Sequence, residues 1–243
     1  GGAALGTSSS KTVWRSGNQD FWIIKTDAAG NRQWANAFGG TSSGPARSVA
    51  QTADGGYILV GETASVAWLD KTSRGFGEFD WWVLKLDANG NLQWQRSFGG
   101  DDQESSTVKV FPTPDGGYFI NGVSYSGVSG NLTVSSGVQG GVWSIKLNAQ
   151  GETQWEYADS RGADPYSTAI LTADGGMLIG GTDYPGVWGS YDFRVTKLDA
   201  AGNTQWSLNY GGTGSEGIRS MRQTSDGGYI LGGSTGSPAS GNK

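Results

Sequence analysis

Short runs along the chain alternate apolar and polar residues with a period of two, and Gly, Asp or Asn bounds each run. In the run 80–87, Trp82 and Leu84 would face one side of a strand, and Trp81 and Val83 would face the other. A strand that is apolar on both sides belongs in a sheet covered on both faces. Because no apolar period of 3.6 residues occurs, the sequence predicts an all-β protein with essentially no helix.

Two phrases recur in alternation. The phrase DWWVLKLDANGNLQWQRSFGG at 80–100 has copies beginning at Asp20, Gly141 and Asp192, while ADGGYILVG at 53–61 has copies at 114–122, 173–181 and 225–233. A fixed unit repeated at this length indicates one supersecondary module stacked several times. We therefore divide a single domain, residues 1–243, into units of about 1–45, 46–104, 105–164, 165–214 and 215–243, with the first and last incomplete.

Each complete unit predicts four antiparallel strands. In the second unit they are Ala46–Thr52, Tyr57–Glu62, Asp80–Asp87 and Leu92–Phe98, with an Asp-Gly turn after the first strand and an Asn-Gly turn after the third. We refer to these strands as a, b, c and d. Four-stranded antiparallel sheets repeated around an axis are the blades of a β-propeller, which is the predicted fold. A solenoid is the alternative, with shorter repeats and parallel strands.

Three residue types recur at fixed places in the units. The Trp of each Gln-Trp pair is predicted to dock between blades and donate its N–H to a neighbouring carbonyl. The Thr two residues before each Asp-Gly-Gly is predicted to stabilise that turn. The Lys on strand c is predicted to pair locally with the Asp or Asn two residues later. These residues are Trp34, Trp94, Trp155 and Trp206; Thr52, Thr113, Thr172 and Thr224; and Lys25, Lys85, Lys146 and Lys197.

The two incomplete units complement each other. The C-terminal unit supplies strands a and b, and the N-terminal unit supplies strands c and d, so joining them gives a fourth blade closed by the N- and C-terminal strands. A spare b-like segment at Gly1–Gly6 keeps a ring of five blades as an alternative, although the number of strands favours four blades.

Composition narrows the chemistry. Net charge is −5 and the chain has no basic run, so no nucleic-acid partner is expected. The sequence contains no apolar run of 18 residues, so no membrane insertion is expected either. The chain has no His and no Cys, which excludes catalysis by a His base or a Cys nucleophile within it, and His-ligated zinc. No cofactor and no metal is predicted, because the Asp-x-x-Gly-Asn turn is too short for an EF-hand calcium loop.

The units resemble the bacterial seven-bladed β-propeller repeat family (SBBP), with a Kelch-like blade organisation. The turn and following Trp are also similar to the tryptophan-docking repeat of PQQ-type propellers. The third unit departs from the pattern at Asn148, where the others have Asp. The resemblance implies a secreted or cell-surface bacterial protein and no single activity. It is carried by Asp80, Trp82, Lys85, Leu86, Asp87, Gly90, Trp94, Gly99, Gly100, Asp115, Gly116 and Gly122.

Candidate binding residues lie in the b–c connections, which vary in length and should share one face with the d–a connections. Three loop tryptophans lie 13 residues after a glycine of the repeat, and the remaining loop offers a tyrosine. We hypothesise that they are stacking platforms for sugar rings, with nearby charged residues as hydrogen-bonding partners; the alternative is that they fold back as lids over the blade edges. The candidates are Trp14, Trp68, Trp188, Tyr125, Asp70, Arg74 and Asp183.

The predicted function is a non-enzymatic binding or adhesion module for an extracellular glycan or surface protein. Two alternatives stay open: a structural module that self-assembles in a longer array, and a glycosidase that uses paired carboxylates near the channel. The residues considered for the glycosidase are Arg47, Glu104, Asp164, Glu216 and Arg219.

Overall fold

A computed structural model describes residues 20–40, 44–64, 70–105, 107–136, 140–160, 168–183 and 191–238. Within these ranges the chain forms sixteen β-strands and no helix, as the two-residue alternation predicts. No helix that could span a membrane is therefore found among the residues described. Four residues singled out from the sequence, Trp14, Trp68, Asp164 and Trp188, lie outside the described residues.

Three sheets have four antiparallel strands each, in chain order, and we call them blades 2, 3 and 4. Blade 2 is β3 (Ala46–Gln51), β4 (Tyr57–Thr63), β5 (Asp80–Leu86) and β6 (Leu92–Phe98). Blade 3 is β7 (Lys109–Pro112), β8 (Tyr118–Ser124), β9 (Gly141–Leu147) and β10 (Thr153–Asp159). Blade 4 is β11 (Thr168–Leu171), β12 (Met177–Asp183), β13 (Asp192–Leu198) and β14 (Thr204–Tyr210).

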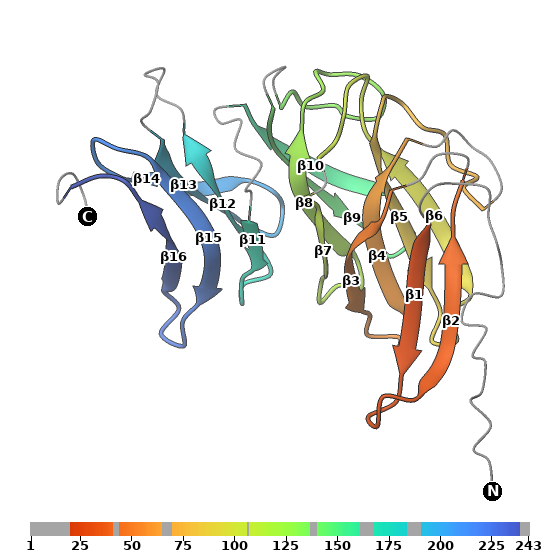
Figure 1. The fold of residues 1–243 in the computed structure, drawn as a ribbon. Helices are drawn as coiled ribbons and strands as arrows, with labels where there is room; N and C mark the ends of the chain where they lie inside the picture. Colours follow the sequence, from red (N-terminus) through yellow and green to blue (C-terminus); the bar gives the residue numbers. More distant parts are fainter. Residues whose placement is uncertain are drawn as a thin grey trace, which may run out of the picture.

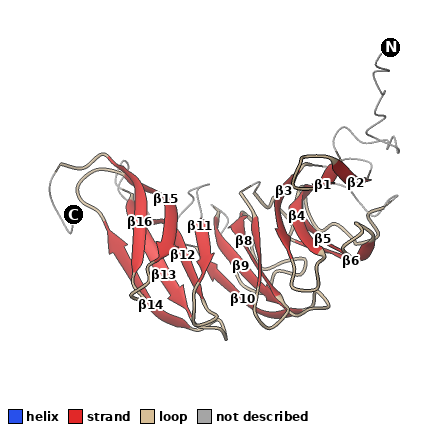
Figure 2. Cartoon of the chain, turned by 90° about the horizontal axis from the view of Figure 1, so that it is seen from below, coloured by secondary structure: helices blue, strands red, loops and turns tan. Residues whose placement is uncertain are grey.

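Two further sheets have two strands each. The N-half-blade is β1 (Phe21–Thr26) and β2 (Arg32–Phe38), and the C-half-blade is β15 (Glu216–Gln223) and β16 (Tyr229–Thr235). The five sheets follow one another in an open arc, with the half-blades at its opposite ends (Figures 1 and 2). This architecture is consistent with the β-propeller class. Among the residues described no sheet closes the arc, so ring closure and the number of blades stay predictions.

The turns explain why Asp-Gly-Gly ends each first strand. Gly55 adopts a φ of 78°, which a residue with a Cβ rarely tolerates. The Thr52 hydroxyl donates to Asp54, whose carboxylate also accepts from the Gly56 N–H. The same Thr–Asp bond recurs in the other three copies, which confirms the predicted turn-stabilising role of these threonines.

The strand-c lysines pair with a different partner from the one the sequence suggested. Lys85 lies 2.8 Å from Asp54, on the turn of the neighbouring hairpin, and not against the nearby Asp87. The equivalent pairs in blades 3 and 4 are Lys146–Asp115 and Lys197–Asp174. The local prediction failed because the Lys side chain reaches across to the a–b turn, whereas Asp87 accepts three hydrogen bonds from its own turn.

Three of the four Gln-Trp tryptophans, Trp34, Trp94 and Trp155, dock as predicted, whereas Trp206 of β14 lies against Tyr229. Trp94 donates its indole N–H to the carbonyl of Ala149 in the next blade, and its ring lies against Gly151. Gly151 has a φ of 76°, and a Cβ there would lie 2.8 Å from the ring, so both the turn and the docking require glycine. Trp34 and Trp155 make the same bond to Ala88 and Ala200.

A second contact between neighbouring blades is a side chain of strand c that inserts against a glycine of strand b. The pairs are Phe21 with Gly61, Trp81 with Gly122, Val142 with Gly181, and Phe193 with Gly233. Valine is too small for its place. It leaves a cavity of about 20 Å³ between blades 3 and 4, which has room for one water molecule.

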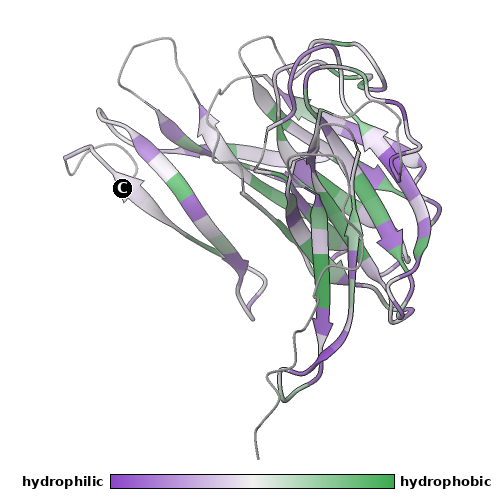
Figure 3. Cartoon of the chain, turned by 45° about the vertical axis from the view of Figure 1, so that its right-hand side comes forward, coloured by the Kyte–Doolittle hydropathy of each residue, from purple (hydrophilic) through white to green (hydrophobic). Residues whose placement is uncertain are grey.

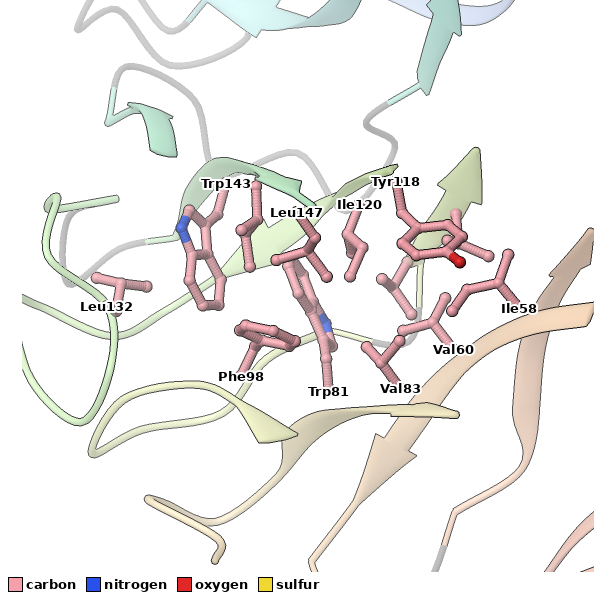
Figure 4. Packing of buried hydrophobic residues seen from close by; sticks show 13 residues of the cluster. Ile58, Val60, Trp81, Val83, Phe98, Tyr118, Ile120, Leu132, Trp143 and Leu147 are labelled. Carbon is pink, nitrogen blue, oxygen red and sulfur yellow. The ribbon is translucent and has the colours of Figure 1, made fainter. Parts of the chain in front are cut away.

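The core consists of layers between the sheets. Strand β5 is buried on both faces, as predicted: Trp82 and Leu84 pack against the N-half-blade, and Trp81 and Val83 against blade 3. Trp81 stacks on Trp143 with ring centroids 4.8 Å apart (Figure 4). Hydrophobic stretches accordingly run along several of the strands (Figure 3). Each such side chain stabilises the stack by roughly 1.5–3 kcal/mol.

Candidate functional site

The tight turns and the irregular connections lie on opposite sides of the arc. In Figure 1 the β1–β2 and β15–β16 turns point downward, while the long connections of the blades lie at the top. The docking bonds place the corresponding c–d turns of blades 2, 3 and 4 on the same side. We call the upper side the loop face. Its connections differ in length and sequence from blade to blade, so it is the side where a ligand site is expected.

A hollow of about 320 Å³ opens on the loop face between blades 2 and 3. Blade 2 contributes the end of β4 and the residue before β5, and the connection from β6 to β7 forms the floor. Tyr125, directly after β8, forms the third side. The lining residues are Glu62, Phe79, Gln103, Glu104, Ser105, Thr107 and Tyr125.

Two aromatic residues of the hollow are fixed through the backbone. The Tyr125 N–H donates to the carbonyl of Gln103 at 3.0 Å, and the Glu104 N–H donates to the carbonyl of Phe79 at 2.7 Å. Phe79 remains 39% exposed, which is unusual for a phenylalanine. Gly140 lies against the Tyr125 ring, because a Cβ at Gly140 would come within 2.6 Å of it. The hollow thus presents aromatic surface on a rigid frame.

Polar groups surround these rings. Glu62 forms an ion pair with Arg47, which leads us to treat it as an ionised hydrogen-bond acceptor. The Ser105 and Thr107 hydroxyls lie 2.7 Å apart and hydrogen-bond to each other. Gln103 is exposed and contributes an amide that can both donate and accept. This set suits a neutral ligand rich in hydroxyl groups.

Glu104 is a structural acid. Its side chain accepts hydrogen bonds from the Ser124 and Ser126 hydroxyls, and only 2% of the residue is exposed. Burial raises the pKa of Glu104 to about 8, with a further contribution from the charge of Asp80. The two carboxyl groups flank Gly99, where a Cβ would lie 2.1 Å from Asp80 and 2.4 Å from Glu104.

The same arrangement recurs at the junction between blade 4 and the C-half-blade. Gly211 lies between Asp192 and Glu216, and a Cβ there would come within 1.9 Å and 2.7 Å of the two carboxyl groups. Repetition at an equivalent place in the fold indicates that this carboxyl pair supports the d–a connection. Glu104, one of the residues considered for a glycosidase, is thus buried and takes part in packing.

A larger groove, of about 600 Å³, lies between the same two blades on the opposite side of the arc, which we call the turn face because it carries the tight turns. Its lining consists of groups already engaged in holding the blades together: the Lys85–Asp54 ion pair and the docked Trp94, with the Arg96 guanidinium 5.9 Å from the ring centroid. We therefore assign the groove to blade packing and take the smaller hollow as the candidate site.

The structure places the other predicted site residues as follows. Asp70 accepts a hydrogen bond from the Gly39 N–H at 3.3 Å and so links the N-half-blade to blade 2. Asp183 contacts Arg194 at 3.6 Å in blade 4, and Arg74 is exposed. Tyr125 alone of the described candidates lines the hollow. Trp14, Trp68 and Trp188 fall outside the described residues.

Sequence reasoning missed Phe79 and Gln103. Neither belongs to a recurring phrase, since Phe79 precedes the copy that starts at Asp80, and Gln103 lies in a d–a connection of unique sequence. A large aromatic residue directly before the predicted strand, at the end of the segment Gly75-Phe76-Gly77-Glu78, was the available signal for Phe79.

Asp87 is held by hydrogen bonds within its own c–d turn. Its carboxylate accepts from the Asn89 and Asn91 N–H groups and from the Asn91 side chain, and these bonds lower the pKa of Asp87, the side-chain bond most strongly. In the part of the chain that the structure describes, no group of three or more carboxylates converges as a metal site would require.

Comparisons with known proteins give the following likenesses. No protein-family model matches the chain. The chain is similar to "Regulatory protein FlaEY" of Caulobacter vibrioides, with 25% identity over 206 residues that cover 80% of this chain. These residues span 21% of that protein, about a fifth of its length. A solved structure of a protein of unknown function from Bacteroides caccae aligns with a TM-score of 0.44 and 11% identity, covering 87% of this chain and 64% of that one.

Proposed function

We propose that the chain is a non-enzymatic binding module whose hollow on the loop face takes a glycan. The observation that supports this most directly is the joint lining of the hollow by Tyr125 and the exposed ring of Phe79, with Glu62 and Gln103 beside them. A module of this kind fits a secreted or cell-surface adhesion protein of a bacterium, whose partner is an extracellular polysaccharide or glycosylated surface protein.

The chemistry of the hollow matches a sugar better than other ligands. The apolar C–H face of a pyranose ring packs on a flat aromatic side chain at low entropy cost, and sugar hydroxyls donate to carboxylate and amide oxygens. Glu62 and Gln103 supply such oxygens at the rim. A volume of about 320 Å³ lies at the lower end of the range for small-molecule sites, which favours the end of a chain or one short segment.

Binding without hydrolysis follows from the state of the two acids. Glu104 is buried and hydrogen-bonded to two serine hydroxyls, while Glu62 is held by Arg47. A glycosidase needs one carboxylic acid and one carboxylate on either side of the glycosidic bond, both able to touch it. Glu104 would have to leave its packing contacts to take that role.

The blades form a β-propeller in this proposal. The N-half-blade supplies the c and d strands that the C-half-blade lacks, and the two together have the strand order of blades 2, 3 and 4. Pairing β16 with β1 would remove two open strand edges, which otherwise invite aggregation. The four-bladed count that the sequence favours treats one N-half-blade and one C-half-blade together as the fourth blade.

Alanine variants test the glycan site. Phe79→Ala and Tyr125→Ala should each lower retention on immobilised polysaccharide by about tenfold or more, since each removes one stacking face. The control is Leu92→Ala on the turn face, where Leu92 is 37% exposed and a similar amount of apolar surface is lost. Retention unchanged by Phe79→Ala and Tyr125→Ala, or no retention of the parent chain on any polysaccharide of a broad panel, would contradict the proposal.

A further inference from the structure

Exposed apolar side chains gather on the outer faces of the arc. Trp22 and Ile24 of β1 are 50% and 44% exposed, whereas their counterparts in blade 2, Trp82 and Leu84, are fully buried. At the other end, Ile230 of β16 is 63% exposed, although its counterpart Ile58 is buried. Leu208 and Tyr210 of β14 are exposed as well. The end faces therefore have the composition of an inter-blade core without the blade that would cover them.

The contacts between blades predict what covers these faces. Trp206 is the docking tryptophan of β14, and in the blades before it the equivalent ring lies on the glycine of the next c–d turn. Gly90, Gly151 and Gly202 each lie under such a ring, while nothing lies within 4 Å of a Cβ built on Gly30. The β1–β2 turn thus offers an uncovered docking glycine, and Trp206 is the ring that fits it.

Charge complementarity gives the same match. In blades 2, 3 and 4, the strand-c lysine pairs with the Asp of the a–b turn. Lys25 of β1 donates instead to Gln33 and to the carbonyl of Thr26, and Asp226 before β16 accepts from Thr224 and Gly228. Pairing β16 with β1 in the register of β4 with β5 places Ile230 opposite Lys25 and brings Asp226 within reach of that lysine.

We infer that the N-half-blade of one copy of this chain seats against the C-half-blade of a second copy, completing a composite blade between them. Within one copy the half-blades stand at opposite ends of the arc, so one chain does not bring them together in this structure (Figure 1). The contact is head to tail. Two copies that close on each other would leave no edge open, and a rotation that does not close would give a filament.

Single-cysteine variants identify the partner, since the chain has no cysteine of its own. Lys25→Cys and Ile230→Cys, purified separately and mixed with a short bismaleimide, should give a cross-linked pair of chains, and neither variant alone should do so. A doubly substituted chain that cross-links only within itself, or mixed variants that do not cross-link, would overturn the inference. Closure within one chain gives the first of those results, and cover of β1 by the segment Gly1–Gly6 gives the second.

A charge swap tests the ion pair. Lys25→Glu and Asp226→Lys should each weaken association by more than about tenfold, and the double variant should regain it. Sedimentation of the parent chain as a monomer at all concentrations, or no rescue in the double variant, would contradict the composite blade. Because this contact is remote from the hollow, loss of glycan retention in Phe79→Ala and loss of association in Lys25→Glu are separate results.

Discussion

The indole of Trp81 lies directly over Gly122, so that a Cβ on Gly122 would come within 2.5 Å of the ring. The pair joins strand c of blade 2 to strand b of blade 3 at the centre of the core that also holds Trp143. Packing therefore requires glycine at this position. At the other junctions between blades, a smaller side chain of strand c lies against the equivalent glycine of strand b.

Gly122→Ala should lower the free energy of unfolding by about 1–3 kcal/mol, because the methyl group meets a ring that has no room to move. The matched control is Gly181→Ala, whose Cβ would meet only Val142 at 3.5 Å, an ordinary contact. Urea denaturation of both variants measures the difference. Equal effects at the two glycines would mean that Trp81 does not fill the space over strand b.

Gly140→Ala should weaken glycan retention more than it affects the core. Gly140 has a φ of 85° and its Cβ would lie 2.6 Å from the Tyr125 ring, so the substitution displaces that ring from the hollow. Gly127→Ala in the same loop is the control, since nothing lies within 4 Å of its Cβ. Affinity electrophoresis compares the two. Similar retention in both variants would show that the position of Tyr125 does not matter for binding.

Trp94→Phe should cost about 1 kcal/mol of stability, because the Ala149 carbonyl loses the indole N–H while most of the aromatic surface stays. Thermal unfolding in dilute solution provides the measurement. A variant as stable as the parent chain would indicate that docking depends on ring contact with Gly151 alone.

Stability should depend on the protonation of Glu104. Its pKa rises from 4.5 to about 8 in the folded chain, so the folded state holds the proton more tightly. This contribution is complete below about pH 4.5 and is lost as the pH rises toward 8, with a slope of at most about 1.4 kcal/mol per pH unit. Glu104→Gln should flatten this decline in denaturation measured across the range. A parent profile that rises with pH between those values would be the opposite of what burial predicts.

Local patterns were sufficient for much of the fold. The alternation around Trp81 and Trp82 gave strand β5 and its two buried faces, and the Asp-Gly pairs gave the turns, since both depend only on neighbouring residues. The partner of Lys85 depends on register across two strands, which spacing alone did not resolve. The hollow depends on Phe79 and Gln103, which come together only when blades 2 and 3 stack.

The curvature of the arc is the least predictable feature. The angle between blades depends on the summed volumes of the side chains between them, such as Trp81 in one junction and Val142 in another. Small differences of this kind add up from blade to blade, and the repeat pattern does not encode them.

Hydrogen–deuterium exchange with and without a retained oligosaccharide tests the central claim most directly, namely that the ligand binds on the loop face. The account predicts slower exchange at residues 79 and 103–107 and around Tyr125, with unchanged exchange at the tight turns 53–56 and 114–117. Protection confined to those turns, with none around Tyr125, would contradict it.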